Sequence, residues 1–342
     1  MSSRKILSDI VAVDPFHERN PAGEHARMRL LGCDFEFESD SPELHRIVTG
    51  AYAGLPRHKL SAAVPRCRVK LMLAPQARKT ARGEMPLIEM FSGADFLGAT
   101  THTSDFVALS PAQRTGLIVV SRAMLRSAYH VRYELLEFSV FTLASRVLGL
   151  VPLHAACIGR GGRGLLLMGD SGAGKTTAAM HCLLRGLDFL SEDSVFVAAD
   201  SLLATGVANF LHPRRDALRF VPDAAAALIQ RAPVIKRRSG VEKFELDLRQ
   251  PRFRLAPRPL KIVASVFMTG EPAGGRPLAT ALRRADLLAK LQAAQPYAAH
   301  QAGWPRFRQR IARLPVYEVR RGGHPTDTVG ALEKILAEAG KH

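Results

Sequence analysis

The chain has 342 residues, of which 47% are hydrophobic and 23% charged, so it can bury a core and wholesale disorder is excluded. Its 48 Lys and Arg outnumber its 31 Asp and Glu, and the net charge of +17 lies mostly after residue 210. Such a surface either keeps the protein soluble or attracts acidic partners. No aromatic run interleaves the basic clusters, which disfavours nucleic acid as a partner.

The start of the chain has no apolar run of about 7–15 residues such as a secretory signal requires. The longest apolar stretch, 138–158, is interrupted by Arg146 and Pro152, so it is too broken for a membrane span of about 20 residues. The four cysteines are widely separated and form no CxxC pair, which is typical of a reducing compartment. We therefore expect a cytoplasmic protein that does not enter the membrane.

Residues 1–125 are expected to form a small N-terminal α/β domain whose role the sequence does not reveal. Residues 33–38 alternate apolar and acidic side chains, which predicts a half-buried strand, and 68–73 repeat the alternation. Between them, Ser39 to Pro42 predict the start of a helix, with apolar residues at helical spacing from Leu44 to Tyr52. The charged stretch 74–86 indicates a loop.

A change of composition near residue 125 predicts a second domain over residues 126–342. Apolar residues recur every three or four positions from Leu125 to Leu148, which predicts one long helix that Gly149 and Pro152 bring to an end. This domain also contains the motif that indicates chemistry.

The motif is a glycine-rich loop placed between a predicted strand and a predicted helix. Residues 153–158 predict a short strand, 159–164 a glycine-rich turn, and 165–168 a buried strand. The next eight residues read GDSGAGKT, which satisfies the pattern G-x-x-x-x-G-K-[ST], and a helix is expected over 175–185, ending at Gly186. The predicted nucleotide-binding residues are Gly169, Asp170, Ser171, Gly172, Ala173, Gly174, Lys175, Thr176 and Thr177.

These residue types suit a polyphosphate. Glycine allows the backbone to turn so tightly that several N–H groups point into one concavity, and the helix N-terminus adds partial positive charge. Lys175 would supply a full charge to the β- and γ-phosphates, and the Thr176 hydroxyl would bind Mg²⁺. The alternative is a glycine-rich turn in which the lysine only caps a helix.

An acidic pair, Glu192 and Asp193, lies between residues 188–190 and a predicted strand over 194–198. A carboxylate beside a nucleotide can accept the proton of an attacking hydroxyl or bind metal; the alternative is a solvated turn. His154 precedes the glycine-rich turn and would lie beside the phosphates if that turn closes a hairpin. Otherwise it is a strand-end histidine satisfied by the backbone.

Further along, residues 261–268 predict a buried strand, and 283–291 and 331–339 predict helices. Residues 322–327 are expected to form a turn in which Thr326 or Asp327 caps the last helix. We also hypothesise that Lys243 lies near the nucleotide.

Together these residues resemble the HPr kinase/phosphorylase family and its wider set of HPr-kinase-like serine kinases. In that family a histidine lies 21 residues before the P-loop lysine, and an acidic pair ends 18 residues after it. His154, Lys175 and Asp193 keep both intervals, and Arg185-Gly186 matches the pair that closes the helix. The resemblance implies a P-loop domain of the HPr-kinase/phosphoenolpyruvate-carboxykinase-like class, with Asp193 as general base and with His154 and Lys175 acting on the phosphates. It also implies Mg²⁺ at Thr176, with Glu192 as a further metal-shell residue.

The sequence departs from this family's motifs in two places, and both departures bear on the expected activity. Neither an LEIRG-like segment with its further metal-binding glutamate nor the segment associated with phosphorylase activity is found, so dephosphorylation is not expected. We expect an ATP- and Mg²⁺-dependent kinase that acts on a Ser or Thr hydroxyl of a protein or peptide, with an acidic acceptor suiting the basic surface. A nucleotide-binding regulatory module and a small-molecule hydroxyl kinase are the alternatives. The resemblance also implies assembly into a homo-oligomer.

Overall fold

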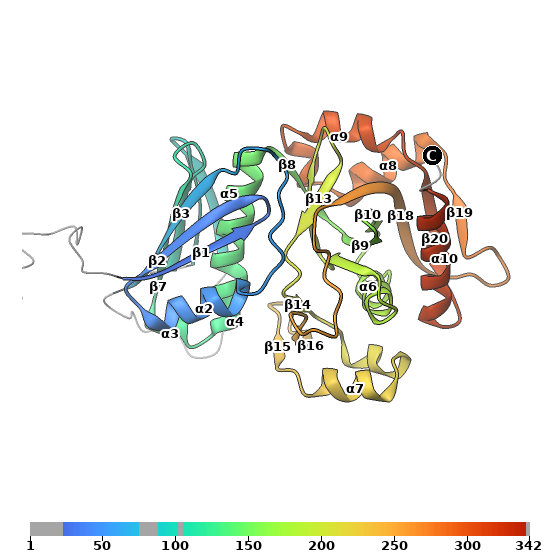
Figure 1. Ribbon diagram of the computed structural model, residues 1–342, viewed down its shortest axis with the longest axis horizontal. Helices are drawn as coiled ribbons and strands as arrows, with labels where there is room; N and C mark the ends of the chain where they lie inside the picture. Colours follow the sequence, from blue (N-terminus) through green and yellow to red (C-terminus); the bar gives the residue numbers. More distant parts are fainter. Residues whose placement is uncertain (1–22, 75–87, 102–104, 340–342) are drawn as a thin grey trace, which may run out of the picture.

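The computed structural model describes residues 23–74, 88–101 and 105–339, which form two main β-sheets with helices packed on them (Figure 1). The chain is therefore an α/β protein, as the sequence predicts. Of the loop expected over 74–86, only Ala74 lies within the described residues. Among the described helices, none combines the length and the apolar character needed to cross a bilayer.

The first sheet has seven strands, of which β2, β3 and β7 run parallel to one another. Helix α2 (Pro42–Tyr52) connects β2 to β3, whereas the antiparallel strands β4 to β6 lie in the chain between β3 and β7. In spatial order the strands are β1 (Glu24–Leu30), β2 (Cys33–Ser39), β3 (Arg66–Leu73), β7 (Thr115–Val120), β6 (Asp105–Ser110), β5 (Phe96–Thr101) and β4 (Ile88–Gly93). Ser41 caps α2, because its hydroxyl accepts a hydrogen bond from the Leu44 N–H. The two strands and the helix predicted in this part of the chain are confirmed.

The helical segment after this sheet differs from the expected single helix. It consists of α3 (Arg122–Leu125), α4 (Ala128–His130), the π-helical stretch η1 (Val131–Leu136) and α5 (Glu137–Leu148). The expectation is wrong for the first half, because an apolar spacing of three or four does not reveal a wider helical turn. Buried side chains of η1 and α5 pack into the core of the first sheet. The division at residue 125 stays a prediction.

The second sheet has nine strands and is mixed, with β10, β18 and β20 parallel to one another. Its main path is β11 (Asp188–Ser191), β9 (Ala156–Arg160), β10 (Arg163–Met168), β18 (Leu260–Pro272), β13 (Leu203–Gly206), β12 (Ser194–Ala198) and β8 (Leu150–His154). Strands β20 (Val316–Arg321) and β19 (Ala279–Ala281) extend it beside β18. The predicted strands 194–198 and 261–268 are confirmed, the latter as part of a longer strand.

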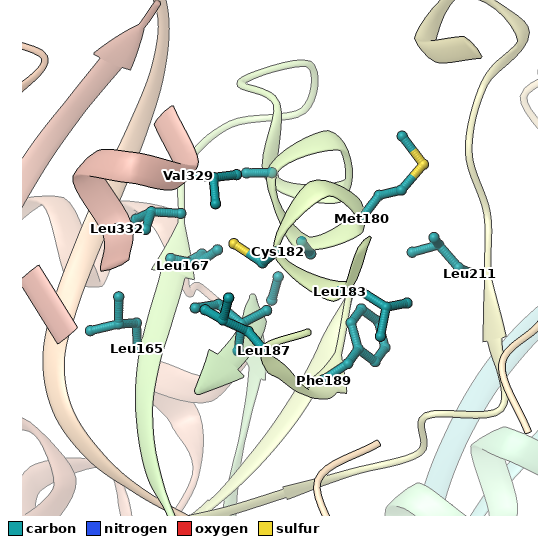
Figure 2. Close-up of a cluster of buried hydrophobic side chains, with 14 of the residues drawn as sticks. Leu165, Leu167, Met180, Cys182, Leu183, Leu187, Phe189, Leu211, Val329 and Leu332 are labelled. Atoms are coloured by element: carbon teal, nitrogen blue, oxygen red, sulfur yellow. The ribbon is translucent and has the colours of Figure 1, made fainter. Parts of the chain in front are cut away.

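Helices cover both faces of this sheet. They are α6 (Lys175–Leu184), α10 (Pro325–Glu338), α8 (Arg284–Ala294) and α9 (Trp304–Ile311). Leu165 and Leu167 of β10 pack with α6 and α10 (Figure 2), whereas Leu166 and Met168 pack with α8 and α9. A strand buried on both faces is apolar at every position, which explains the run that precedes the glycine-rich loop.

Smaller elements fold over the edge of the second sheet that carries the loop. They are η2 (Arg215–Phe220), α7 (Asp223–Gln230), η3 (Ala298–His300) and two short pairs, β14 (Phe210–Leu211) with β17 (Leu246–Asp247) and β15 (Val234–Lys236) with β16 (Glu242–Phe244). The last helix begins at Pro325, earlier than expected, and its N-cap is His324. Asp327 takes part in capping this helix, as predicted, but from inside its first turn: it forms a capping box with His324, whose N–H its carboxylate accepts.

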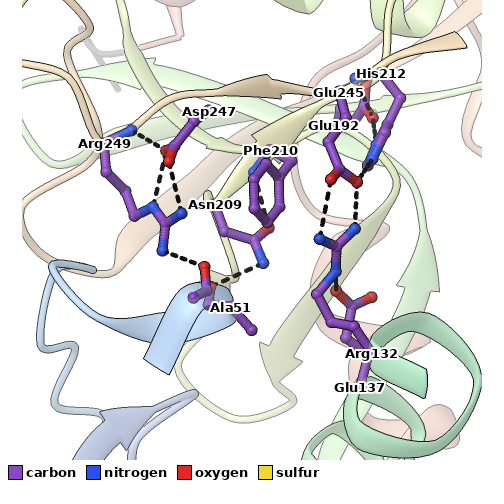
Figure 3. Close-up of polar contacts among 11 residues, drawn as sticks. Ala51, Arg132, Glu137, Glu192, Asn209, Phe210, His212, Glu245, Asp247 and Arg249 are labelled. Carbon is purple, nitrogen blue, oxygen red and sulfur yellow. Dashed lines mark hydrogen bonds and ion pairs between the residues drawn. The ribbon is translucent and has the colours of Figure 1, made fainter. Parts of the chain in front are cut away.

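Hydrogen bonds join the part of the chain that carries the first sheet to the part that carries the second, and those of His58 and Asn209 are buried. The ring of His58 bridges to the hydroxyl of Thr205, and the Asn209 amide donates to the Ala51 carbonyl at 3.2 Å (Figure 3). Arg249 donates to the last carbonyls of α2, where a cation also complements the helix dipole. These four side chains tie the first 60 residues to segments after residue 200.

Candidate active site

The glycine-rich loop runs from the end of β10 into α6, as its sequence predicts. Gly172 and Gly174 adopt φ angles of 86° and 95°, which favour glycine. Gly169 has a φ of 138°, and a Cβ there would lie 2.3 Å from the Met268 carbonyl oxygen. The loop can therefore form only with glycine at the point where it passes β18. Gly174 supplies no side-chain cap, so no side chain caps the start of α6.

Lys175 is folded against this loop. Its Nζ donates to the carbonyl oxygens of Gly169, at 2.6 Å, and of Asp170, at 3.1 Å. Burial lowers the pKa of the ammonium group below 10.5, while the charges of Asp193 and Asp170 act in the opposite direction. The side chain is thus held within the loop and faces the carboxylate predicted as the base.

A cavity of about 390 Å³ opens beside the loop, and His154 and Asp193 line it together with loop residues. The predicted nucleotide-binding residues on its wall are Asp170, Ser171, Gly172, Gly174, Lys175, Thr176 and Thr177. Gly169 and Ala173 do not line the cavity. Residues that are widely separated in the sequence thus converge here.

His154 and Asp193 contact each other directly. The Nδ1 atom of His154 lies 3.1 Å from Asp193 Oδ1. The contact follows from strand pairing, because β8 and β12 are antiparallel with His154 opposite Ser194. The expected strand 153–158 is in fact two strands separated at Ala155, so His154 belongs to β8, whereas β9 closes the hairpin with β10.

Buried Gln295 fixes the backbone of His154. Its amide oxygen accepts the His154 N–H at 2.8 Å, and its amide nitrogen donates to the His154 carbonyl at 2.9 Å. Neither the spacing nor the composition of the sequence indicated this residue. It anchors the backbone from which the His154 imidazole extends.

Asp193 is ionised over the whole neutral range. Burial alone would raise its pKa, but the hydrogen bond to His154 and the charges of His154, Arg237 and Lys243 lower it to about 2. The carboxylate is thus free of a proton and surrounded by positive groups.

Glu192 has a different environment from its neighbour. Its Oε1 accepts hydrogen bonds from the backbone N–H of His212, at 3.0 Å, and from the ring Nδ1, at 2.8 Å (Figure 3). The other ring nitrogen of His212 lies 3.3 Å from Glu245, which forms a two-pronged ion pair with Arg132. Burial alone would lower the pKa of His212, but its two carboxylate partners raise it. Glu192 does not line the loop's cavity, so of the two predicted metal ligands only Thr176 lies there.

Three further cations line this cavity: Arg214 and Arg237, which the sequence suggests only as part of the basic surface, and Lys243. Arg237 NH1 lies 3.8 Å from Asp193 Oδ2, and the Arg237 guanidinium lies over the ring of Tyr133. Burial lowers the pKa of Lys243, and the charge of Arg237 lowers it further. The hypothesis that Lys243 lies near the nucleotide stays a prediction, although Lys243 lines the cavity beside the loop. The only signal for Arg237 was the basic run 236–238.

No family model matches the chain, and no curated protein matches it either. Among solved structures it is similar to the HPr(Ser) kinase/phosphatase from Coxiella burnetii, with 11% sequence identity and a TM-score of 0.24. The match covers 55% of this chain and 94% of that chain. At this TM-score the likeness decides neither the fold nor the activity.

Proposed function

We propose that this chain is an ATP- and Mg²⁺-dependent kinase of the HPr-kinase-like type, which transfers the γ-phosphoryl group to a Ser or Thr hydroxyl of a protein or peptide. One observation carries the proposal: the His154–Asp193 pair shares a single cavity with the glycine-rich loop and Lys175. A loop that suits phosphates and a charged carboxylate that suits a hydroxyl therefore lie within one site.

The loop and the cations around it would hold the triphosphate. Backbone N–H groups at the start of α6 lack side-chain caps and would donate to phosphate oxygens. Lys175 would exchange its two carbonyl partners for phosphate oxygens, which are stronger acceptors. Arg237 and Lys243 line the same cavity and would stabilise the negative charge that spreads over the transferring group.

The residues present fit Mg²⁺ bound mainly through the nucleotide. Within the described ranges, no cluster of three or more His, Cys, Asp or Glu side chains could hold a metal ion by itself. Mg²⁺ commonly keeps several waters and binds through one or two protein ligands plus phosphates, so the Thr176 hydroxyl is a sufficient anchor. The ion would neutralise phosphate charge when bound.

Asp193 would act as the general base. As the acceptor oxygen attacks the γ-phosphorus, its proton passes to the Asp193 carboxylate, the new O–P bond forms, and the bond to the bridging oxygen breaks to release ADP. With a pKa of about 2, Asp193 holds no proton near pH 7. Because so low a pKa also makes it a weak base, it would take the proton only as the acceptor oxygen bonds to phosphorus and becomes acidic. His154 orients the carboxylate through Nδ1.

Transfer of label from γ-labelled ATP to a panel of Ser- and Thr-containing peptides tests this proposal. Asp193→Asn keeps the size of the side chain but removes the base, so we expect near-normal ATP binding and transfer reduced about 100-fold or more. Lys175→Met should instead lose ATP binding, which separates the two roles. Full transfer by Asp193→Asn would refute the assignment of the base.

A regulatory nucleotide-binding module is the second candidate, and the position of Glu192 favours it. Glu192 is engaged by His212 and does not line the loop's cavity, so the second carboxylate of the pair does not serve as a metal ligand there. ATP binding by the wild type without label on any acceptor would support this candidate over the kinase.

A further inference from the structure

A second cavity, the apolar cleft, adjoins the loop's cavity and shares His154 and Asp193 with it. The apolar cleft has a volume of about 600 Å³, and its walls come from five separate parts of the chain. The residues that shape it are Met90 of β4, Phe138 and Phe141 of α5, Pro152 of β8, Phe196 of β12 and Tyr297. This volume lies within the range of about 300–1,000 Å³ that is common for ligand sites.

The lining of the apolar cleft carries few ionisable groups. Of the described residues on its walls, His154 and Asp193 are the only ones that carry a titratable acid or base, apart from the phenol of Tyr297. The Gln295 amide also lies there, but both of its polar atoms are bonded to the backbone of His154. The hydroxyls of Thr142, Ser145 and Ser194 are the other polar groups on its walls, and they are neutral. A charged group placed among the aromatic rings would lose its water without gaining an ion pair, so an apolar group is the suitable occupant.

The ends of the apolar cleft define how an occupant would enter. At its outer rim, Met90 is 73% exposed and Tyr297 is 60% exposed, so the cleft is open to solvent there. Asp193, which the cleft shares with the loop's cavity, marks the part of the cleft next to the loop. An extended chain can therefore leave the cleft past the rim while the group next to Asp193 reaches the reacting phosphate.

We infer that the apolar cleft is the acceptor site, and that it binds a bulky apolar side chain of a peptide directly beside the Ser or Thr that is phosphorylated. The inference rests on the proposed function, because it takes Asp193 as the base that meets the acceptor hydroxyl. It adds a substrate class: the basic surface attracts acidic chains at long range, whereas the cleft selects an apolar neighbour of the hydroxyl.

Peptides that differ only beside the serine test the inference. In the apolar series the residue beside the serine is Leu or Phe, and in the charged series it is Asp or Lys. Each peptide also has a Ser→Ala version, whose binding to the ATP-loaded protein is measured by fluorescence anisotropy. Burying one such apolar side chain should tighten binding about tenfold or more over the charged series. The same preference should appear in KM for transfer.

Met90→Gln and Tyr297→Ser probe the rim, where exposure makes misfolding a small concern. Each should weaken binding of the apolar peptides about three- to tenfold and leave ATP binding unchanged. Phe96→Gln is the matched control, because Phe96 is 49% exposed on the neighbouring strand β5 but does not line the cleft. It should leave binding of both peptide series unchanged.

The two proposals fail in different ways. Equal binding of both peptide series, or an equal effect of Met90→Gln and Phe96→Gln, would overturn the inference about the cleft even if transfer occurs. Selective binding of the apolar Ser→Ala peptides without transfer to their serine versions would support the cleft and refute the kinase. Label transfer to small apolar alcohols, with neither peptide series bound, would also overturn the peptide as occupant.

Discussion

Glu245→Gln tests the buried network that links the helical segment to the site, because it removes one charge and keeps the shape of the side chain. The Glu245 carboxylate pairs with the Arg132 guanidinium and lies within hydrogen-bond distance of the His212 ring (Figure 3). The side chains of Arg132 and Glu245 are only 9% and 12% exposed, so solvent weakens this interaction little.

The shift in the pKa of Glu245 gives the size of the expected loss of stability. Burial alone would raise its pKa, but the hydrogen bonds from His212 and Arg132 lower it from 4.5 to about 2. Since each tenfold change is worth about 1.4 kcal/mol, the ionised carboxylate stabilises the fold by about 3 kcal/mol at neutral pH. Loss of one partner of a buried ion pair costs a similar amount, about 3–5 kcal/mol.

The loss of stability in Glu245→Gln should become smaller in acid. Because the folded-state pKa is the lower one, this stabilisation is complete above about pH 4.5 and is lost as the pH falls toward 2. Urea unfolding followed by circular dichroism should therefore find Glu245→Gln less stable by about 3 kcal/mol at pH 7 and by about 2 kcal/mol at pH 3.5.

The control is Glu271→Gln, since Glu271 forms an ion pair with Arg276 but its side chain is 66% exposed. That variant should stay within about 0.5 kcal/mol of the wild type at both pH values. A loss below about 1 kcal/mol for Glu245→Gln at pH 7, or one that does not shrink in acid, would show that the ionised carboxylate does not hold this network.

Two further substitutions test the supports of the site. Gly169→Ala would put a Cβ 2.3 Å from the Met268 carbonyl oxygen, at a φ of 138°. We therefore expect urea unfolding to show a free energy of unfolding lower by about 2 kcal/mol or more, together with weaker ATP binding. Unchanged values in both assays would contradict the loop geometry. Gln295→Ala leaves the backbone N–H and C=O of His154 without their buried partner. It should lower the free energy of unfolding by about 2 kcal/mol and lower kcat for transfer more than it raises KM for ATP. An unchanged kcat would show that Gln295 does not position His154.

The sequence predicted those elements that are determined by residues close to one another in the chain. The alternation at 33–38, the Ser41 cap and the loop from Gly169 into α6 each depend on neighbouring residues, and the structure agrees with them. The intervals from His154 to Lys175 and on to Asp193 also led to side chains that meet, although their chemical roles remain proposals.

Features that depend on distant partners could not be predicted in this way. The break at Ala155 follows from the pairing of β8 with β12 and of β9 with β10, which no local pattern encodes. Glu192 and Asp193 are adjacent and chemically alike, yet His212 engages the first and His154 the second. Arg237 belongs to a run of three cations, and only the fold distinguishes it from its neighbours.

The hydrogen bonds between the two sheets have a consequence for motion. His58, Asn209 and Arg249 each join the first 60 residues to segments after residue 200, and any hinge opening along this seam would have to break their contacts together. Unpairing the buried bonds of His58 and Asn209 is costly, so rigid-body closure of one half on the other is an unfavourable way to exclude water from the site.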